Sequence, residues 1–169
     1  MGNAEMLPWL EYTGQAPTEL VAQAEANRVD SIVEAFATAL FEKETRLGRD
    51  FFSKVELYIY AINWLEREVN NGGFTQFFSN SSHVFTPVIV QALLTAGLPK
   101  TAMITQSAID ALELPDNYDF AEIVSAALAD DEDRQFLLNE LDIRFLEYEE
   151  DLSGVLFEYI QAHINQIQF

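Results

Sequence analysis

The sequence contains no cysteine and only nine lysine and arginine side chains. The absence of cysteine excludes disulfides and Cys-ligated metals, and it makes a cytoplasmic location natural. The scarcity of basic residues leaves no basic patch, so we expect no direct binding to nucleic acid or to an anionic membrane. The N-terminus also lacks a basic region followed by an apolar run, so we expect no signal peptide.

Long apolar runs are missing as well. One uncharged stretch extends from Val69 to Pro99, but Asn, Gln, Ser, Gly and Pro interrupt it. Its best apolar run, residues 88–96, contains Gln91 and is too short to cross a bilayer. We therefore interpret this stretch as the buried middle of a globular domain.

Motifs for catalysis and for metal binding are also absent. The only two histidines, His83 and His163, are eighty residues apart, and neither has a partner at a zinc-site spacing. No signature of a metalloprotease, a serine hydrolase or a phosphate-binding loop occurs. The contiguous acids at 130–133 lack the alternating ligands and the central glycine of an EF-hand. The sequence therefore predicts no enzymatic activity, no metal and no cofactor.

Acidic residues are what the chain has in excess. Its 28 acidic side chains give a formal net charge of −19. Sixteen of them fall between Asp110 and Glu158, where only Arg134 and Arg144 offset them. A hydrophobic content of 49% and an aromatic content of 12% exclude a disordered acidic tail. Such a folded, acid-coated protein is expected to attract basic protein surfaces.

Apolar residues recur at helical spacing throughout, and no segment alternates with the period of a strand. We expect residues 1–16 to form a loosely ordered lead-in, and residues 17–169 to form one all-α domain. This single-domain helical bundle should contain about seven or eight helices. The pattern predicts that Gly72 and Gly73 end a long helix, and that Pro87 lies at the start of another helix, which Gly97 ends. Capping boxes are predicted at Ser31-x-x-Glu34, Ser53-x-x-Glu56 and Asp119-x-x-Glu122.

The most individual segment is VNNGGFTQFFSNSS, residues 69–82. Turn chemistry and helix capping account for its residue types, so it has a complete structural interpretation. The segment also resembles the signature of a bacterial family long labelled a domain of unknown function, whose characterised member is a 19-kDa DNA-mimic protein. The resemblance extends over about residues 50–165. The residues assigned to the signature are Asn70, Asn71, Gly72, Gly73, Phe74, Gln76, Phe77, Phe78 and Asn80.

This resemblance implies an all-helical fold, a homodimer and the absence of catalysis. It also implies competition with DNA for a DNA-binding protein, as the characterised member competes for a transcription factor. The signature itself is structural in character, so the prediction of mimicry rests on the acidic residues.

The acids of residues 110–158 are dense enough to imitate DNA. Fourteen net negative charges on three helices laid side by side give about one charge per 1.8 Å, against about one per 1.7 Å of duplex. Asp133, Glu140, Glu147 and Asp151 are expected on one side of the penultimate helix, with Arg144 between them and with Asp142 and Glu149 in a neighbouring row. The predicted partner-binding residues are Asp130, Asp131, Glu132, Asp133, Glu140, Glu147, Glu149, Glu150, Asp151 and Glu158.

The leading hypothesis is a non-enzymatic regulator that occupies the DNA-binding surface of a basic protein, in particular a transcription factor. The alternative is an immunity protein or antitoxin that neutralises a basic nuclease toxin through the same charges. A third hypothesis is a metal-dependent hydrolase with clustered carboxylates, which a bound stoichiometric ion would reveal. The simplest alternative is a solvated acidic face that only keeps the protein soluble.

Overall fold

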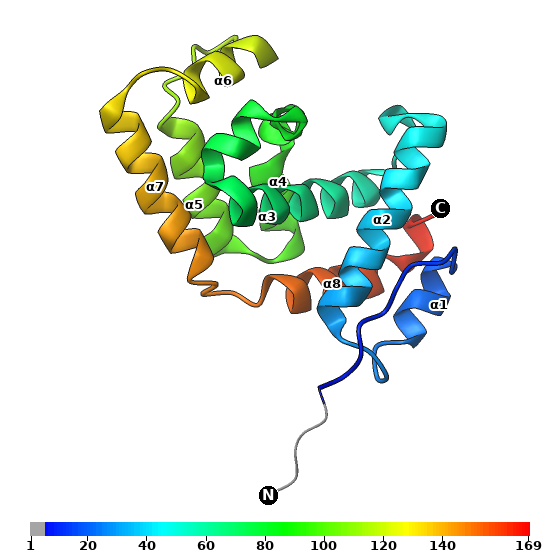
Figure 1. Cartoon of the computed structure of the whole chain (residues 1–169). Coiled ribbons are helices and arrows are strands. Elements are labelled where there is room, and N and C mark those ends of the chain that lie inside the picture. The colour runs from blue at the N-terminus through cyan, green and yellow to red at the C-terminus, as the bar shows by residue number, and fades with distance from the viewer. Residues whose placement is uncertain (1–5) are drawn as a thin grey trace, which may run out of the picture. The chain divides into compact units, whose positions relative to one another are not determined.

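A computed structural model describes residues 6–169, and every regular element in that range is a helix (Figure 1). Residues 1–5, part of the expected lead-in, lie outside the described residues. The prediction of an all-α fold with seven or eight helices is confirmed for the described range. The eight α-helices are α1 (Pro17–Ala22), α2 (Val29–Leu47), α3 (Lys54–Ser79), α4 (Thr86–Ala96), α5 (Pro99–Asp110), α6 (Phe120–Ala127), α7 (Glu132–Leu146) and α8 (Leu152–Ala162). Three 3-10 helices accompany them, namely η1 (Arg49–Phe51), η2 (Ser81–Phe85) and η3 (Ile164–Gln166).

The chain divides into two compact units, and the boundary falls inside α3. The first unit contains the described residues up to Tyr60 together with Leu152–Phe169, and the second unit contains Ala61–Asp151. The first unit therefore holds α1, α2, α8 and the start of α3. The second unit holds the rest of α3 and helices α4 to α7, which carry most of the predicted site.

In the first unit, α2 packs against α1 and α8, and a buried ion pair fastens the C-terminal residues to this core. Lys43 Nζ lies 2.9 and 2.8 Å from the two carboxylate oxygens of Glu56. Lys43 also donates to the carbonyl of Gln168 at 2.8 Å, and the Gln168 N–H donates to Glu56 at 2.7 Å. Because both charges meet opposite charge and backbone dipoles, their burial is tolerated.

Residues 6–16 contain no helix, but hydrogen bonds tie them to the start of α2. The Arg28 N–H donates to the carbonyl of Pro8 at 3.0 Å, and the Leu10 N–H donates to the Ser31 hydroxyl at 2.9 Å. The predicted capping box at Ser31 is wrong, because Ser31 lies inside α2, which begins at Val29. Its hydroxyl donates to the Arg28 carbonyl and accepts from Leu10 instead.

The other two predicted capping boxes are confirmed. The Ser53 N–H donates to Glu56 at 2.8 Å, and the Glu56 N–H donates to the Ser53 hydroxyl at 3.1 Å. At the start of α6, Asp119 and Glu122 make the same reciprocal pair of bonds at 2.7 and 2.9 Å. These bonds satisfy N–H groups that the first helical turn leaves without partners.

In the second unit, α5 packs against α4 and against α7 (Figure 1). Gly72 and Gly73 have non-helical backbone geometry, so the first helical segment of α3 ends at them, which confirms the prediction from the sequence. A second helical segment follows this kink and continues to Ser79. Three phenylalanines after the kink are completely buried and begin the core of this unit, namely Phe74, Phe77 and Phe78.

Candidate protein-interaction site

Helix α7 carries the central part of the predicted acidic surface. It begins where the Asp131 carboxylate accepts the Arg134 N–H at 3.0 Å, which caps the first turn. Its inner side is a buried apolar row of Leu138, Leu141 and Phe145. Because this row fixes the rotation of the helix, the acids on the opposite side are held towards solvent.

Three exposed carboxylates lie along that outer side, on Asp133, Glu140 and Glu147. They recur every seven residues, and seven residues make almost two helical turns, so they share one side of α7 and its C-terminal cap. The structure gives these side chains, and also Asp130 and Glu132, no ion pair or hydrogen bond within residues 6–169. The same holds for Arg144, which forms no ion pair with Glu140 or Glu147.

Helix α7 stops at Leu146, so the acids at 149–151 do not continue this row. Tyr148 has a φ of +48°, and this left-handed conformation turns the chain away from the helix. The expected extension of the row along one helix to Asp151 is therefore wrong. Glu158 lies on α8, which belongs to the first unit.

Other predicted partner-binding acids have internal partners. Glu149 pairs with Lys100 at 3.0 Å. Glu150 accepts the backbone N–H groups of Lys100 at 3.0 Å and Thr101 at 2.9 Å, and so caps α5 from outside that helix. Burial raises the pKa of Glu150, but these bonds and the Thr101 hydroxyl outweigh it and hold the pKa below its ordinary value. Asp131 is likewise engaged as the cap of α7.

Asp142 faces the kink of α3 rather than a partner, contrary to the expected row with Glu149. Its carboxylate accepts the Phe74 N–H at 2.7 Å, and burial raises its pKa although that bond lowers it. Gly73 has a φ of +76°, and a β-carbon there would lie 2.7 Å from the Asp142 carboxyl carbon. Glycine is therefore required at 73 both by the backbone and by the approach of α7.

The signature segment forms the rest of this junction. The buried Glu68 accepts the Gln76 amide at 2.6 Å and the Asn80 amide at 3.0 Å, across the kink. The Asn70 amide donates to the Tyr148 hydroxyl, just beyond the end of α7. The segment thus holds α3 in its kinked form and ties α7 to it, which agrees with a structural role for the signature.

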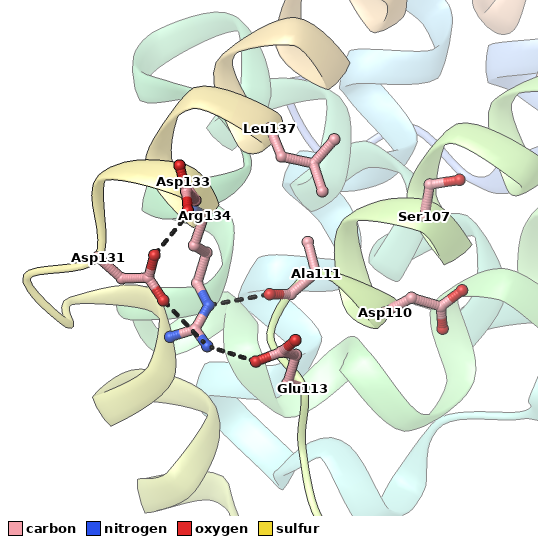
Figure 2. Close-up of a pocket in the computed structure, with 8 residues that line it drawn as sticks. All are labelled: Ser107, Asp110, Ala111, Glu113, Asp131, Asp133, Arg134 and Leu137. Atoms are coloured by element: carbon pink, nitrogen blue, oxygen red, sulfur yellow. Dashed lines mark hydrogen bonds and ion pairs between the residues drawn. The ribbon is translucent and has the colours of Figure 1, made fainter.

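The N-terminal end of α7 borders an open hollow of about 640 Å³ (Figure 2). Arg134 is nearly buried there and donates to the carbonyls of Ala111 at 2.9 Å and Ala126 at 3.0 Å. Its guanidinium also lies 3.5 Å from Glu113 and 3.6 Å from Asp131. Arg134 thus fastens the start of α7 to the ends of α5 and α6. The lining residues are Ser107, Asp110, Ala111, Glu113, Asp131, Asp133, Arg134 and Leu137.

Within residues 6–169, no three His, Asp or Glu side chains gather in a way that could hold a metal ion. In the same range, no helix is both long enough and apolar enough to span a membrane.

A comparison with protein families matches residues 50–163 to the family described as DMP19-like protein. The chain therefore belongs to the DMP19-like protein family, which is a DNA-mimic family. The matched range includes the segment 69–82 and all of α7. Searches of curated proteins and of solved structures gave no match.

Proposed function

We propose that the protein is a non-enzymatic DNA mimic that binds the DNA-binding surface of a basic protein, such as a transcription factor, and blocks its access to DNA. The observation that carries the proposal is the exposed row of Asp133, Glu140 and Glu147, which form no ion pair or hydrogen bond within residues 6–169. Membership of a DNA-mimic family supports the same function.

The spacing of the row suits this role. Seven residues of α-helix rise about 10.5 Å, so the three carboxylates extend over about 21 Å. Three phosphate-to-phosphate steps of one DNA strand rise about 10 Å along the duplex axis. The axial spacing of the row therefore matches that of every third phosphate of one strand, and Glu132 adds a charge beside Asp133. The ten acids predicted from the sequence reduce to a smaller set of available charges in the second unit, namely Asp130, Glu132, Asp133, Glu140 and Glu147.

The rigidity of α7 adds to the electrostatic effect. The buried row of Leu138, Leu141 and Phe145 and the bonds of Arg134 hold the helix in place. Because these carboxylates lie on a fixed helix, binding lysine and arginine does not carry the entropy cost of ordering a flexible loop. Because the carboxylates are exposed, the association is fast at low salt and weakens as salt shortens the Debye length from about 10 Å at 0.1 M to about 3 Å at 1 M.

The experiment is a capture from host lysate on immobilised protein, followed by elution with duplex DNA. We expect a DNA-binding protein that duplex DNA displaces. The variant with Asp133→Lys, Glu140→Lys and Glu147→Lys is expected to bind that protein at least tenfold more weakly, because repulsion replaces three ion pairs. Capture that duplex DNA does not disturb contradicts the proposal.

A matched control variant distinguishes the effect of the α7 carboxylates on affinity from the effect of the protein's net charge. Glu25, Glu42 and Asp50 are exposed acids of the first unit. Changing these three to lysine alters the net charge by the same amount and should leave the affinity nearly unchanged. If both triple variants lose affinity equally, the effect is a general one of charge, and α7 is not the site.

The same capture distinguishes a nuclease from a transcription factor. A captured nuclease whose activity falls on mixing indicates the antitoxin alternative, whereas a captured repressor or activator supports the leading proposal. The family also leads us to expect a cytoplasmic homodimer, and sedimentation equilibrium of the full chain measures its oligomeric state.

A further inference from the structure

The outer side of α7 carries apolar side chains that imitation of phosphates does not explain. Phe136 is 68% exposed and Ile143 is 57% exposed. They are seven residues apart and lie opposite the buried row of Leu138, Leu141 and Phe145, so they share one stripe of the helix. Leu137 and Leu146, which are 46% and 44% exposed, flank this stripe.

Carboxylates alternate with these apolar groups. Glu140 follows Phe136 by four residues and precedes Ile143 by three, and Glu147 follows Ile143 by four. Residues at these spacings are neighbours on a helix, with β-carbons about 5–6 Å apart. The mixed stripe is therefore the row Phe136, Glu140, Ile143 and Glu147, which has no basic member.

A phosphate backbone has no phenyl or branched alkyl group. The apolar side chains of the stripe are therefore expected to contact apolar groups of a partner rather than its charges. Burying a large apolar side chain at an interface contributes favourably, and salt does not screen this contribution as it screens ion pairs. A partner surface that binds both the apolar and the acidic side chains of the stripe must alternate apolar groups with cationic ones. An amphipathic helix with lysine or arginine beside a row of aliphatic residues has this pattern.

Charge complementarity favours this occupant over a second copy of the chain. A two-fold interface brings the same patch of both copies together. An axis through the middle of α7 would place Glu140 against the same residue of the second copy, and Asp133 near Glu147 of that copy. Such like-charged contacts are unfavourable, whereas a basic helix pairs with each acid.

We propose that the mixed stripe of α7 is a docking surface for a basic amphipathic helix of the partner. This inference rests on the proposed function, because it assigns the contact surface for the same basic protein. It adds that the partner is selected by apolar contacts as well as by charge. Part of the binding therefore survives salt concentrations that abolish binding of a purely cationic ligand.

The test uses a fluorescent synthetic peptide of leucine and lysine, with its leucines on one helical face, and the full-length protein. A scrambled peptide of the same composition is the control ligand. Anisotropy at two salt concentrations is expected to show that the wild type binds the amphipathic peptide at least tenfold more tightly than the scrambled one. The variant with Phe136→Ser and Ile143→Ser should lose this preference and still bind the scrambled peptide normally.

The matched control variant combines Met103→Ser and Leu128→Ser, whose side chains are 66% and 64% exposed elsewhere in the second unit. It should keep the preference, and circular dichroism should show native helix content in both variants. If the stripe variant keeps the preference, the inference is overturned. It is also overturned if sedimentation shows a wild-type dimer that the stripe variant converts to a monomer, since a second copy then covers this face.

The results that would refute the docking surface differ from those that would refute the proposed function. If the lysine variants of Asp133, Glu140 and Glu147 abolish capture of a DNA-displaceable protein while the stripe variant does not affect it, the function stands and the inference fails. If the stripe determines peptide preference but no captured protein is displaced by duplex DNA, the docking surface stands and the mimicry fails.

Discussion

Replacing Gly73 with alanine, at the junction between α3 and α7, should lower the free energy of unfolding of the protein more than replacing a glycine that has open space around it. The φ of +76° and ψ of −176° at Gly73 are nearly exclusive to glycine, and an L-residue there costs about 1–3 kcal/mol. The new β-carbon would also lie 2.7 Å from the Asp142 carboxyl carbon. The carboxylate must then move away from the Phe74 N–H, and losing such a charged hydrogen bond costs about 1.5–3 kcal/mol. We expect a total loss of about 3–5 kcal/mol.

Urea unfolding followed by circular dichroism measures this loss, and two comparisons isolate its causes. Gly48 has a φ of +92°, and no atom lies within 4 Å of the position that a β-carbon would take there. Gly48→Ala should therefore cost only the backbone strain of about 1–3 kcal/mol. Asp142→Ala alone should cost about 1–3 kcal/mol, because the Phe74 N–H is left without its acceptor. Combining Asp142→Ala with Gly73→Ala removes the clash.

The double variant should therefore be less destabilised than the sum of the two single changes by about 1–3 kcal/mol. Additivity within about 0.5 kcal/mol would show that the two residues do not interact. A Gly73→Ala cost no larger than that of Gly48→Ala would likewise refute the close approach. Either result would show that Gly73, which belongs to the signature segment, is not required for the close approach of α3 and α7.

Three further predictions concern other bonds. Glu150→Gln should lower stability at pH 7 by about 0.5–2 kcal/mol, as loss of a helix cap does, measured by urea unfolding. Because the folded-state pKa of Glu150 is lowered, the wild-type advantage exists above the ordinary value of 4.5 and should disappear as pH falls through the folded-state value. Lys43→Met should cost about 3–5 kcal/mol in thermal or urea unfolding, since it leaves the buried Glu56 charge unpaired. Because burial raises the folded-state pKa of Asp142, the wild type should lose stability as pH rises from 3.8 through that raised value. Urea unfolding of Asp142→Asn should not show this loss, since the amide does not ionise.

Much of the fold could be predicted from the sequence because the local signals act over short distances. The capping boxes at Ser53 and Asp119 and the left-handed cap at Gly97 involve neighbouring residues, and all are present. Ser31 has the same local pattern but different tertiary surroundings, because its hydroxyl bonds to Leu10 and to Arg28. The glycines at 72 and 73 interrupt the helix as predicted, but the sequence did not show that the distant Asp142 accepts the Phe74 N–H at this kink.

The site was harder to predict because a carboxylate's availability depends on residues far away in the chain. Glu150 has the same side chain as Glu147 and lies only three residues further on, yet Lys100 and Thr101 bind Glu150 and not Glu147. The conformation of Tyr148, which ends the helix, depends on no motif that the sequence displays. The exposure of Phe136 could have been suspected from its position opposite Leu138, since the two lie on opposite sides of one helix.

The most direct test of DNA mimicry is a three-component binding measurement with the captured DNA-binding protein and its labelled duplex. The account predicts mutual exclusion, so the wild-type protein should release the duplex while the lysine variant of Asp133, Glu140 and Glu147 should not. A stable ternary complex of the wild-type protein, its partner and the duplex would contradict the central claim.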